Sequence, residues 1–235
     1  MAKHEILLGL TTTPASDWRG KVEEMKKFGI QRIALFPTFL KIEERKELYS
    51  LLEEIQDLEI PHVHLRNDMT MDEIQYFKER FKSEVFNIHP TGTRHDFSDD
   101  FTKFSSETYV ENLRMVPKKE ELSKYAGICI DFSHWENGTR KKSTGFDSLL
   151  NYNLAMLDRL KENKVGCCHV SGIKSKFNPI NYLFQFDRHY FKKLSDFDYM
   201  SKYKQYLPKY VSLELENTLE EQIKVKQYLQ KMLKI

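Results

Sequence analysis

The sequence alternates between short apolar runs and longer amphipathic segments. Eight runs have the length and apolar content of buried strands, at residues 6–10, 32–36, 60–65, 85–89, 108–111, 127–131, 165–170 and 210–215. Segments with helical periodicity lie between most of them, at residues 17–28, 41–55, 70–81, 118–125, 147–161, 196–206 and 219–233. Alternation of this kind predicts parallel strands that are joined by right-handed crossovers.

The eight units predict an α/β fold, a closed (β/α)8 TIM barrel with eight parallel strands, as a single domain over residues 1–235. An open, doubly wound sheet is the alternative, and it usually carries a glycine-rich phosphate loop after its first strand. Residues 9–14 read Gly-Leu-Thr-Thr-Thr-Pro and lack that loop. The first helix has an expected N-cap at Asp17 and an expected end at Gly29.

The cysteines and the net charge indicate the redox compartment of the protein and some of the ligands it could bind. Cys129, Cys167 and Cys168 lie inside apolar runs, and an odd number with two adjacent residues does not suggest a disulfide framework. We therefore expect reduced thiols and a cytoplasmic protein, and the lack of a C-x-x-C motif disfavours a thiolate zinc site. The sequence patterns predict neither a secretory signal nor a membrane span. The formal net charge of +2 argues neither for nor against binding of nucleic acid.

Six consecutive strands, the third to the eighth, end in an imidazole or a carboxylate. These side chains are His62, His64, His89, Glu111, Asp131, His134, His169, Glu214 and Glu216. Functional side chains of a TIM barrel lie at the carboxyl ends of its strands, so we expect these groups to meet at one mouth. A single histidine at a strand end is more often a hydrogen-bonded structural residue than a ligand. Charged groups gathered at a mouth, however, are costly unless they are paired or bind a metal, so the pattern predicts a divalent-metal site.

The chemistry of these side chains indicates which ions could bind. Imidazole and carboxylate ligands without thiolate suit zinc, manganese, iron or magnesium, and abundant histidine favours zinc or manganese. The number of ligands suggests more than one ion. Paired ions can hold both the attacking and the leaving oxygen when a phosphate is displaced.

Several of these motifs resemble those of the xylose-isomerase-like barrels and, among them, of the endonuclease IV family (type 2 apurinic/apyrimidinic endonucleases). Residues 87–90 (Asn-Ile-His-Pro) resemble its fourth-strand His-Pro motif, and residues 110–112 (Val-Glu-Asn) resemble its fifth-strand Glu-Asn. Residues 127–134 (Gly-Ile-Cys-Ile-Asp-Phe-Ser-His) are similar to its Asp-x-x-His signature. His169 and Glu214 stand where its seventh-strand histidine and last metal glutamate are expected. The resemblance covers roughly residues 58–233.

The triplet Asp187-Arg188-His189 adds the most discriminating similarity. Endonuclease IV has such a triplet, and the sugar isomerases and epimerases of the superfamily do not usually share it. The resemblance implies up to three zinc ions. One would be held by His64 and His89, one by Asp131, His169 and Glu214 with Glu111 bridging to the first, and one by His134, Asp187 and His189.

Two ligand assignments stay open. His62 and His64 point to the same face of their strand; His64 is preferred because it lies nearer the strand end, although Pro61-His62 also resembles the family. Glu214 and Glu216 pose the same choice, and the Leu-Glu match favours Glu214. The family's glycine-rich sequence near the first strand is absent, and so is its glycine-rich continuation after Asp-Arg-His. Such departures affect loops that would touch DNA more than they affect metal ligands.

The resemblance implies a zinc-dependent phosphodiesterase that hydrolyses DNA 5′ to abasic sites. Glu111 would be the catalytic residue, since it would bridge two ions and orient the nucleophile. Substrate contacts are expected from Arg188, Lys174 and Lys176, in a basic segment that is interleaved with aromatic residues.

Two other functions compete with this one. A sugar or sugar-phosphate isomerase or epimerase would use one divalent ion, with Glu111 and Glu214 as acid and base. A non-catalytic binding module is the third hypothesis. The expected partner is DNA with abasic sites, or a small sugar under the alternative, without membrane contact. A monomer is expected, because the helix-rich exterior offers no clear partner surface.

Overall fold

The computed structural model describes residues 4–92, 101–113, 115–140, 148–173 and 187–235. In this part of the chain, eight parallel strands close into a barrel in the order β1-β10-β7-β6-β5-β4-β3-β2. They are β1 (Glu5–Thr11), β2 (Arg32–Phe36), β3 (Glu59–His64), β4 (Val85–Ile88), β5 (Thr108–Glu111), β6 (Gly127–Asp131), β7 (Val165–Val170) and β10 (Tyr210–Leu213). The closed barrel confirms the predicted (β/α)8 fold.

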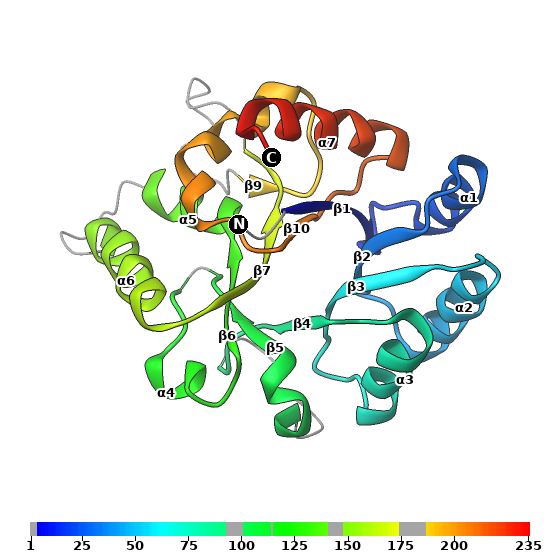
Figure 1. Cartoon of the computed structure of the whole chain (residues 1–235), viewed down its shortest axis with the longest axis horizontal. Helices are drawn as coiled ribbons and strands as arrows, with labels where there is room; N and C mark the ends of the chain where they lie inside the picture. The colour runs from blue at the N-terminus through cyan, green and yellow to red at the C-terminus, as the bar shows by residue number, and fades with distance from the viewer. Residues whose placement is uncertain (1–3, 93–100, 114, 141–147, 174–186) are drawn as a thin grey trace.

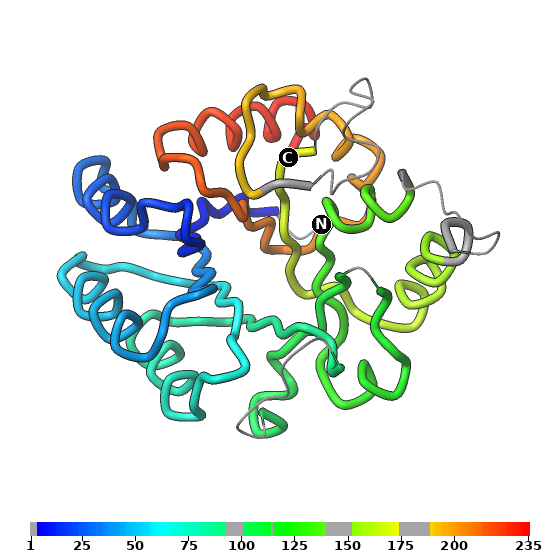
Figure 2. The backbone as a smooth tube through the Cα atoms, turned by 180° about the vertical axis from the view of Figure 1, so that it is seen from behind, coloured from blue at the N-terminus to red at the C-terminus, as the bar shows by residue number. Residues whose placement is uncertain are grey.

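Helices surround the barrel (Figure 1), and the view from behind shows the same ring (Figure 2). They are α1 (Trp18–Phe28), α2 (Ile42–Glu53), α3 (Met71–Phe81), α4 (Lys119–Leu122), α5 (Phe132–Arg140), α6 (Ser148–Glu162) and α7 (Leu219–Leu233), with the 3-10 helices η1 (Phe101–Glu107) and η3 (Leu194–Tyr206). Asp17 caps α1 by accepting a bond from the Gly20 amide at 2.9 Å, and Gly29 ends this helix with a φ of 63°. Both predicted boundaries of α1 are confirmed.

Two hydrophobic cores lie on the two faces of the barrel sheet. The outer core joins the strands to the helices and includes Ile128, Ile130 and Cys168. The inner core comes from strand residues alone, namely Leu7, Ala34, Phe36, Val85, Tyr109, Cys129, Cys167 and Tyr210. Because side chains alternate along a strand, inner-core residues identify which positions of each strand face the barrel interior.

The structure differs from the sequence expectations after the sixth strand. The sequence predicts no helix between residues 131 and 147, but residues 132–140 form the helix α5. This short helix buries Phe132 and Trp135, and the ring of Tyr203 on η3 packs against both, with its centroid 5.3 and 4.8 Å away. The segment preceding β10 is also a 3-10 helix rather than the expected α-helix.

A two-stranded antiparallel sheet lies beyond the seventh barrel strand. It pairs β8 (Gly172–Ile173) with β9 (Asp187–Arg188). The backbone of His189, just after β9, accepts a bond from the Glu216 amide. The Asp-Arg-His triplet therefore returns to the end of β10, on the mouth side of the barrel.

Candidate metal centre

The candidate ligands meet at the carboxyl ends of the strands because of the strand alternation. On β5, Tyr109 belongs to the inner core and Glu111 lies two residues later. The same spacing relates Cys129 to Asp131 and Cys167 to His169. Glu111, Asp131 and His169 are at most 2% exposed. These polar groups therefore form the upper layer of the barrel interior, above the hydrophobic inner core.

The first group consists of His64, His89 and Glu111, whose ligand atoms all lie within 4.8 Å of one another. Nε2 of His64 is 3.1 Å from both Nε2 of His89 and Oε2 of Glu111. Desolvation and the nearby His64 imidazole lower the pKa of His89 to about 4. The His89 ring is thus neutral at pH 7, as a metal ligand must be.

The second group consists of Asp131, His169 and Glu214, again with ligand atoms within 4.8 Å. Nδ1 of His169 lies 3.4 Å from Oε2 of Glu214 and 3.5 Å from Oε2 of Glu111. Neither contact has hydrogen-bond geometry, and Oδ2 of Asp131 also lacks a hydrogen-bond partner although it is buried. Buried polar atoms are rarely left unsatisfied. Two such atoms in one group of imidazole and carboxylate donors fit a divalent cation.

Charge interactions around His169 favour the ionised forms of Glu214 and Glu111. Burial opposes ionisation of Glu214, but nearby His189 and His169 outweigh it and lower the pKa of this carboxyl to about 2. Burial likewise opposes ionisation of Glu111, and the neighbouring His169 holds its pKa well below the usual range. For Asp131 burial is the stronger influence, and it raises the pKa of this carboxyl. A bound cation would relieve this unfavourable burial of Asp131.

Asn87 orients two of the candidate ligands from below. Its amide Nδ2 donates to Oε2 of Glu111 at 2.7 Å. A carboxylate can only accept, so the carbonyl Oδ1 of Asn87 faces the ring nitrogens of His62 and His169, at 2.9 and 3.3 Å. Asn87 therefore accepts the Nε2 proton of His169. Burial opposes charging of this ring, but Glu111 and Glu214 outweigh it and raise the pKa of His169 well above the usual range, so a cation at Nδ1 would displace a proton.

Asp131 is held by a second set of bonds. Its Oδ1 accepts from the Ser133 hydroxyl at 2.5 Å and from the His134 amide at 2.8 Å, which also caps α5. Asn112 fixes the backbone of Asp131 by donating to its carbonyl and accepting from its amide. One carboxylate oxygen is thus used for structure, and the other points into the second group.

His134 and His189 lie at the rim of the second group. His134 forms a third group with Glu111 and Asp131, and its Nε2 is 3.6 Å from Oδ2 of Asp131. Nδ1 of His189 lies 3.2 Å from the carbonyl of Glu214 and 3.8 Å from its Oε2. The side chains of Asp187 and Arg188 lie outside the described residues, as do Lys174 and Lys176. The triplet's role as ligands therefore stays a prediction.

The members of the two residue pairs that the sequence left open, His62 and His64 and Glu214 and Glu216, lie in different surroundings. His64 joins His89 and Glu111 at the mouth, whereas His62 lies deeper, bonded to Ser212 and Asn87. Glu214 belongs to the second group. Glu216 instead accepts a bond from the Thr13 hydroxyl at 2.5 Å. His64 is thus the member of its pair at the mouth, whereas His62 belongs to a deeper group with Cys129 and His169.

Sequence reasoning missed the residues that hold the ligands in place. Asn87, Asn112 and Ser133 stood inside the quoted motifs but had no assigned role. The available signal was strand alternation, since Asn87 lies two residues after the inward-facing Val85. Ser212 carried the same signal, two residues after Tyr210.

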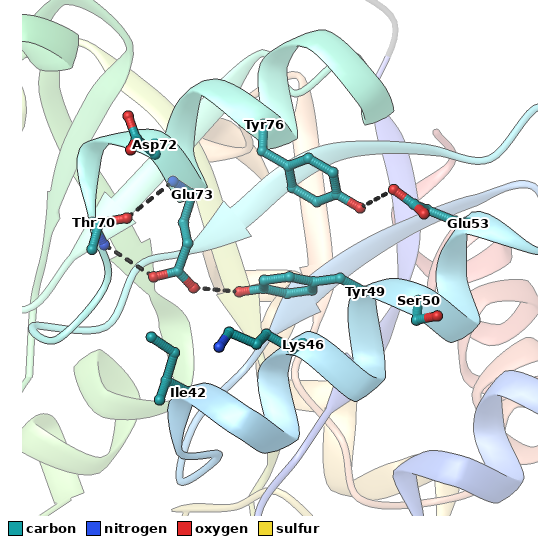
Figure 3. Close-up of a pocket in the computed structure, with 9 residues that line it drawn as sticks. All are labelled: Ile42, Lys46, Tyr49, Ser50, Glu53, Thr70, Asp72, Glu73 and Tyr76. Carbon is teal, nitrogen blue, oxygen red and sulfur yellow. Dashed lines mark hydrogen bonds between the residues drawn. The ribbon is translucent and has the colours of Figure 1, made fainter.

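A cavity of about 480 Å³ lies away from the mouth, between α2 and α3 (Figure 3). Its polar groups largely bond one another: Glu73 accepts from Tyr49 and from the Thr70 amide, and Glu53 accepts from Tyr76. None of the candidate metal groups among the described residues includes a residue of this cavity. We therefore place the candidate site at the barrel mouth.

Fold and site together define a (β/α)8 barrel with a candidate divalent-metal centre at the carboxyl ends of its strands. No protein-family model matches the chain, and no curated protein matches it. Among the described helices, none is long and apolar enough to cross a membrane.

Proposed function

We propose that this protein is a metal-dependent phosphodiesterase that hydrolyses DNA 5′ to abasic sites, with zinc as the metal. One observation carries the proposal: Glu111 belongs to two of the candidate groups, one with His64 and His89 and one with Asp131 and His134. A carboxylate shared in this way suits a centre that holds more than one ion. The resemblance to the endonuclease IV family supports DNA as the substrate.

The donor set assigns residues to each ion. His64, His89 and Glu111 would hold the first, and Asp131, His169 and Glu214 the second. A third ion would take His134 together with Asp187 and His189. When bound, divalent ions supply Lewis acidity toward a phosphate and lower the pKa of water.

The side chains around the candidate centre orient its ligands and keep water away from its base. Asn87 holds Oε2 of Glu111 and thereby fixes the direction of the shared carboxylate. Glu111 would orient the attacking oxygen, since its charge lies between the two groups. The fully buried His169 and the nearly buried Glu214 exclude water from the base of the centre, which strengthens electrostatic interactions there. Arg188, Lys174 and Lys176 would contact the DNA backbone. We also propose that the protein acts as a monomer in the cytoplasm.

A sugar or sugar-phosphate isomerase is the second candidate. It is favoured by Glu111 and Glu214 both approaching Nδ1 of His169, with Oε2 atoms 3.5 and 3.4 Å away. Two carboxylates around one ion could serve as acid and base on a sugar carbon. The number of ions bound per chain separates this candidate from the first, because one ion would suffice.

The test is incision of a duplex that carries one abasic-site analogue, with zinc-loaded protein and with chelator. We expect chelator-sensitive cleavage 5′ to the analogue and none of an undamaged duplex. Glu214→Gln should abolish cleavage and lower the zinc content, whereas Glu216→Gln should retain both. Absence of cleavage with zinc demonstrably bound would contradict DNA as the substrate. One bound ion together with turnover of a sugar phosphate would establish the isomerase instead.

A further inference from the structure

Two thiols face each other inside the barrel, below the candidate metal centre. Cys129 on β6 and Cys167 on β7 are register partners of adjacent parallel strands. Both belong to the inner core, and both are fully buried. Neighbouring strands lie only about 4.8 Å apart, so side chains at paired positions on one face are in contact range.

An imidazole lies beside Cys129, and Cys167 joins this arrangement through its strand pairing with Cys129. His62, from β3 across the barrel, has a ligand atom within 4.8 Å of those of Cys129 and His169. His62 is fully buried, and its two ring nitrogens contact Ser212 at 2.7 Å and Asn87 at 2.9 Å. His169 lies between this cluster and the mouth, since its Nδ1 faces Glu111 and Glu214.

The donor chemistry of this cluster differs from that of the mouth. Buried cysteines usually act as small hydrophobic residues, but here two of them lie side by side with an imidazole near. Thiolate and imidazole donors select soft cations such as zinc and copper(I). Sequence spacing gave no sign of this, because the thiols are brought together by strand register and not by a C-x-x-C motif.

We propose that Cys129, Cys167 and His62 form a second cation site, specific for soft, thiophilic ions, in the barrel interior. Binding would form two sulfur–metal bonds and one nitrogen–metal bond, and the two thiol protons would pass to solvent. His62 would release one of its two hydrogen bonds. The Ser212 hydroxyl can rotate to another acceptor, so release of Nδ1 is the smaller loss.

The adjacent Cys168 provides a matched control. It is as fully buried as its neighbour, but it belongs to the outer core, and its thiol lies 3.6 Å from the carbonyl of Tyr210. Strand alternation directs it away from the barrel interior. A serine at this position should leave the proposed site intact.

The experiment is a cadmium titration of the folded, zinc-loaded full chain, in which cadmium replaces any zinc held by the thiols. The ultraviolet charge-transfer band of cadmium–thiolate bonds reports the binding. The mouth ligands contain no sulfur, so the band reports the interior site whether or not the protein cleaves DNA. We expect a saturable band with one cadmium per chain. Cys129→Ser and Cys167→Ser should each lose most of it, and Cys168→Ser should retain it.

Two results would overturn the proposal. One is the absence of a thiolate band in the folded wild-type chain, and the other is a band that depends on Cys168 instead of Cys129 and Cys167. If the interior variants do not fold, cadmium NMR of the wild-type chain decides the question. A resonance in the range of mixed sulfur and nitrogen ligands would support the site, and resonances of oxygen and nitrogen ligands alone would contradict it.

Discussion

Asn87 contacts three titratable side chains with a single amide group. It donates to Glu111 and accepts from His62 and His169, and it is fully buried. Bonds of this kind fix the tautomer and orientation of metal ligands, and their loss typically costs 10–100-fold in metal affinity. At the residue scale, the candidate centre therefore depends on a neutral side chain that binds no ion itself.

We predict that Asn87→Leu weakens zinc binding by roughly 10–100-fold. The reason is that Glu111 and His169 lose their shared partner while every ligand stays present. Competition with a chelator of known affinity measures the change. Asn163→Leu, which removes an amide bonded to the Arg159 carbonyl at the other end of β7, is the control. Equal affinities of the two variants would contradict the role of Asn87.

Lys21 gives a second prediction at this scale. The residue is 2% exposed, and its ammonium group bonds the Leu215 carbonyl at 2.7 Å. Burial lowers its pKa from 10.5 to about 7. The unfolded chain therefore binds more protons than the folded chain between these two values. The contribution of Lys21 to stability rises with pH across this window, by up to about 1.4 kcal/mol per pH unit, and its cost is greatest below the folded pKa.

Urea unfolding between about pH 7 and pH 9 tests this dependence, because one group supplies a slope of at most one proton. Lys21→Met should flatten the rise in unfolding free energy with pH. Lys27→Met, on the exposed side of the same helix, should leave the rise unchanged. A wild-type slope that persists in Lys21→Met would assign the effect to other groups.

At the element scale, most strands and helices could be predicted from the sequence. The runs at 32–36, 108–111, 127–131 and 165–170 coincide with β2, β5, β6 and β7. Helix α5 could not be found, because it is short and its apolar residues pack against η3, which is distant in sequence. The helix also begins at a candidate ligand, since Asp131 caps it. The meeting of six strand ends was predictable, whereas the bonds made by Asn87 and Ser133 depend on three-dimensional neighbours.

The double use of Asp131 leads to a prediction about α5. Asparagine is an equally good N-cap, so Asp131→Asn should keep the bond to the His134 amide while it removes the anionic ligand. In chelator, Asp131→Asn should be as stable as the wild type or more stable, since a buried carboxylate is gone. Asp131→Ala should lose about 1 kcal/mol. Both variants should bind less zinc.

Urea unfolding in chelator, together with zinc content, separates the two functions of Asp131. Asp131→Asn that is as unstable as Asp131→Ala would show that the carboxylate charge, and not the cap, stabilises α5. Wild-type zinc content in both variants would remove Asp131 from the set of ligands.

At the scale of the whole molecule, the candidate groups join strands from most of the barrel. Ligands come from β3, β5, β6 and β7 or from the residues just after β4, β6 and β10. An ion held there would connect strands that are distant in sequence, and it binds only the folded chain. Folding stability should therefore depend on the metal.

We predict that chelator lowers the thermal unfolding midpoint and that added zinc restores it. An ion at a hundred times its dissociation constant stabilises the fold by about 2.7 kcal/mol. Calorimetry of the wild-type chain and of Glu111→Gln, with and without zinc, measures the shift. Glu111→Gln should respond weakly, because it lacks the shared carboxylate. An identical response of both chains would contradict a central position for Glu111.

The alternation of inward and outward residues along β6 has a consequence for sequence change. Cys129 and Asp131 face the interior while Ile128 and Ile130 face the helices, so every second position can vary without repacking the outer core. Substitutions at the inward positions would act on the candidate ion sites and the inner core while the outer core stays in place, whereas deletion of one residue would exchange the two faces and destroy both. Point mutations on the inward face can therefore change the chemistry of the barrel interior. An insertion or deletion of one residue in a strand is not tolerated, because it shifts the register of that strand.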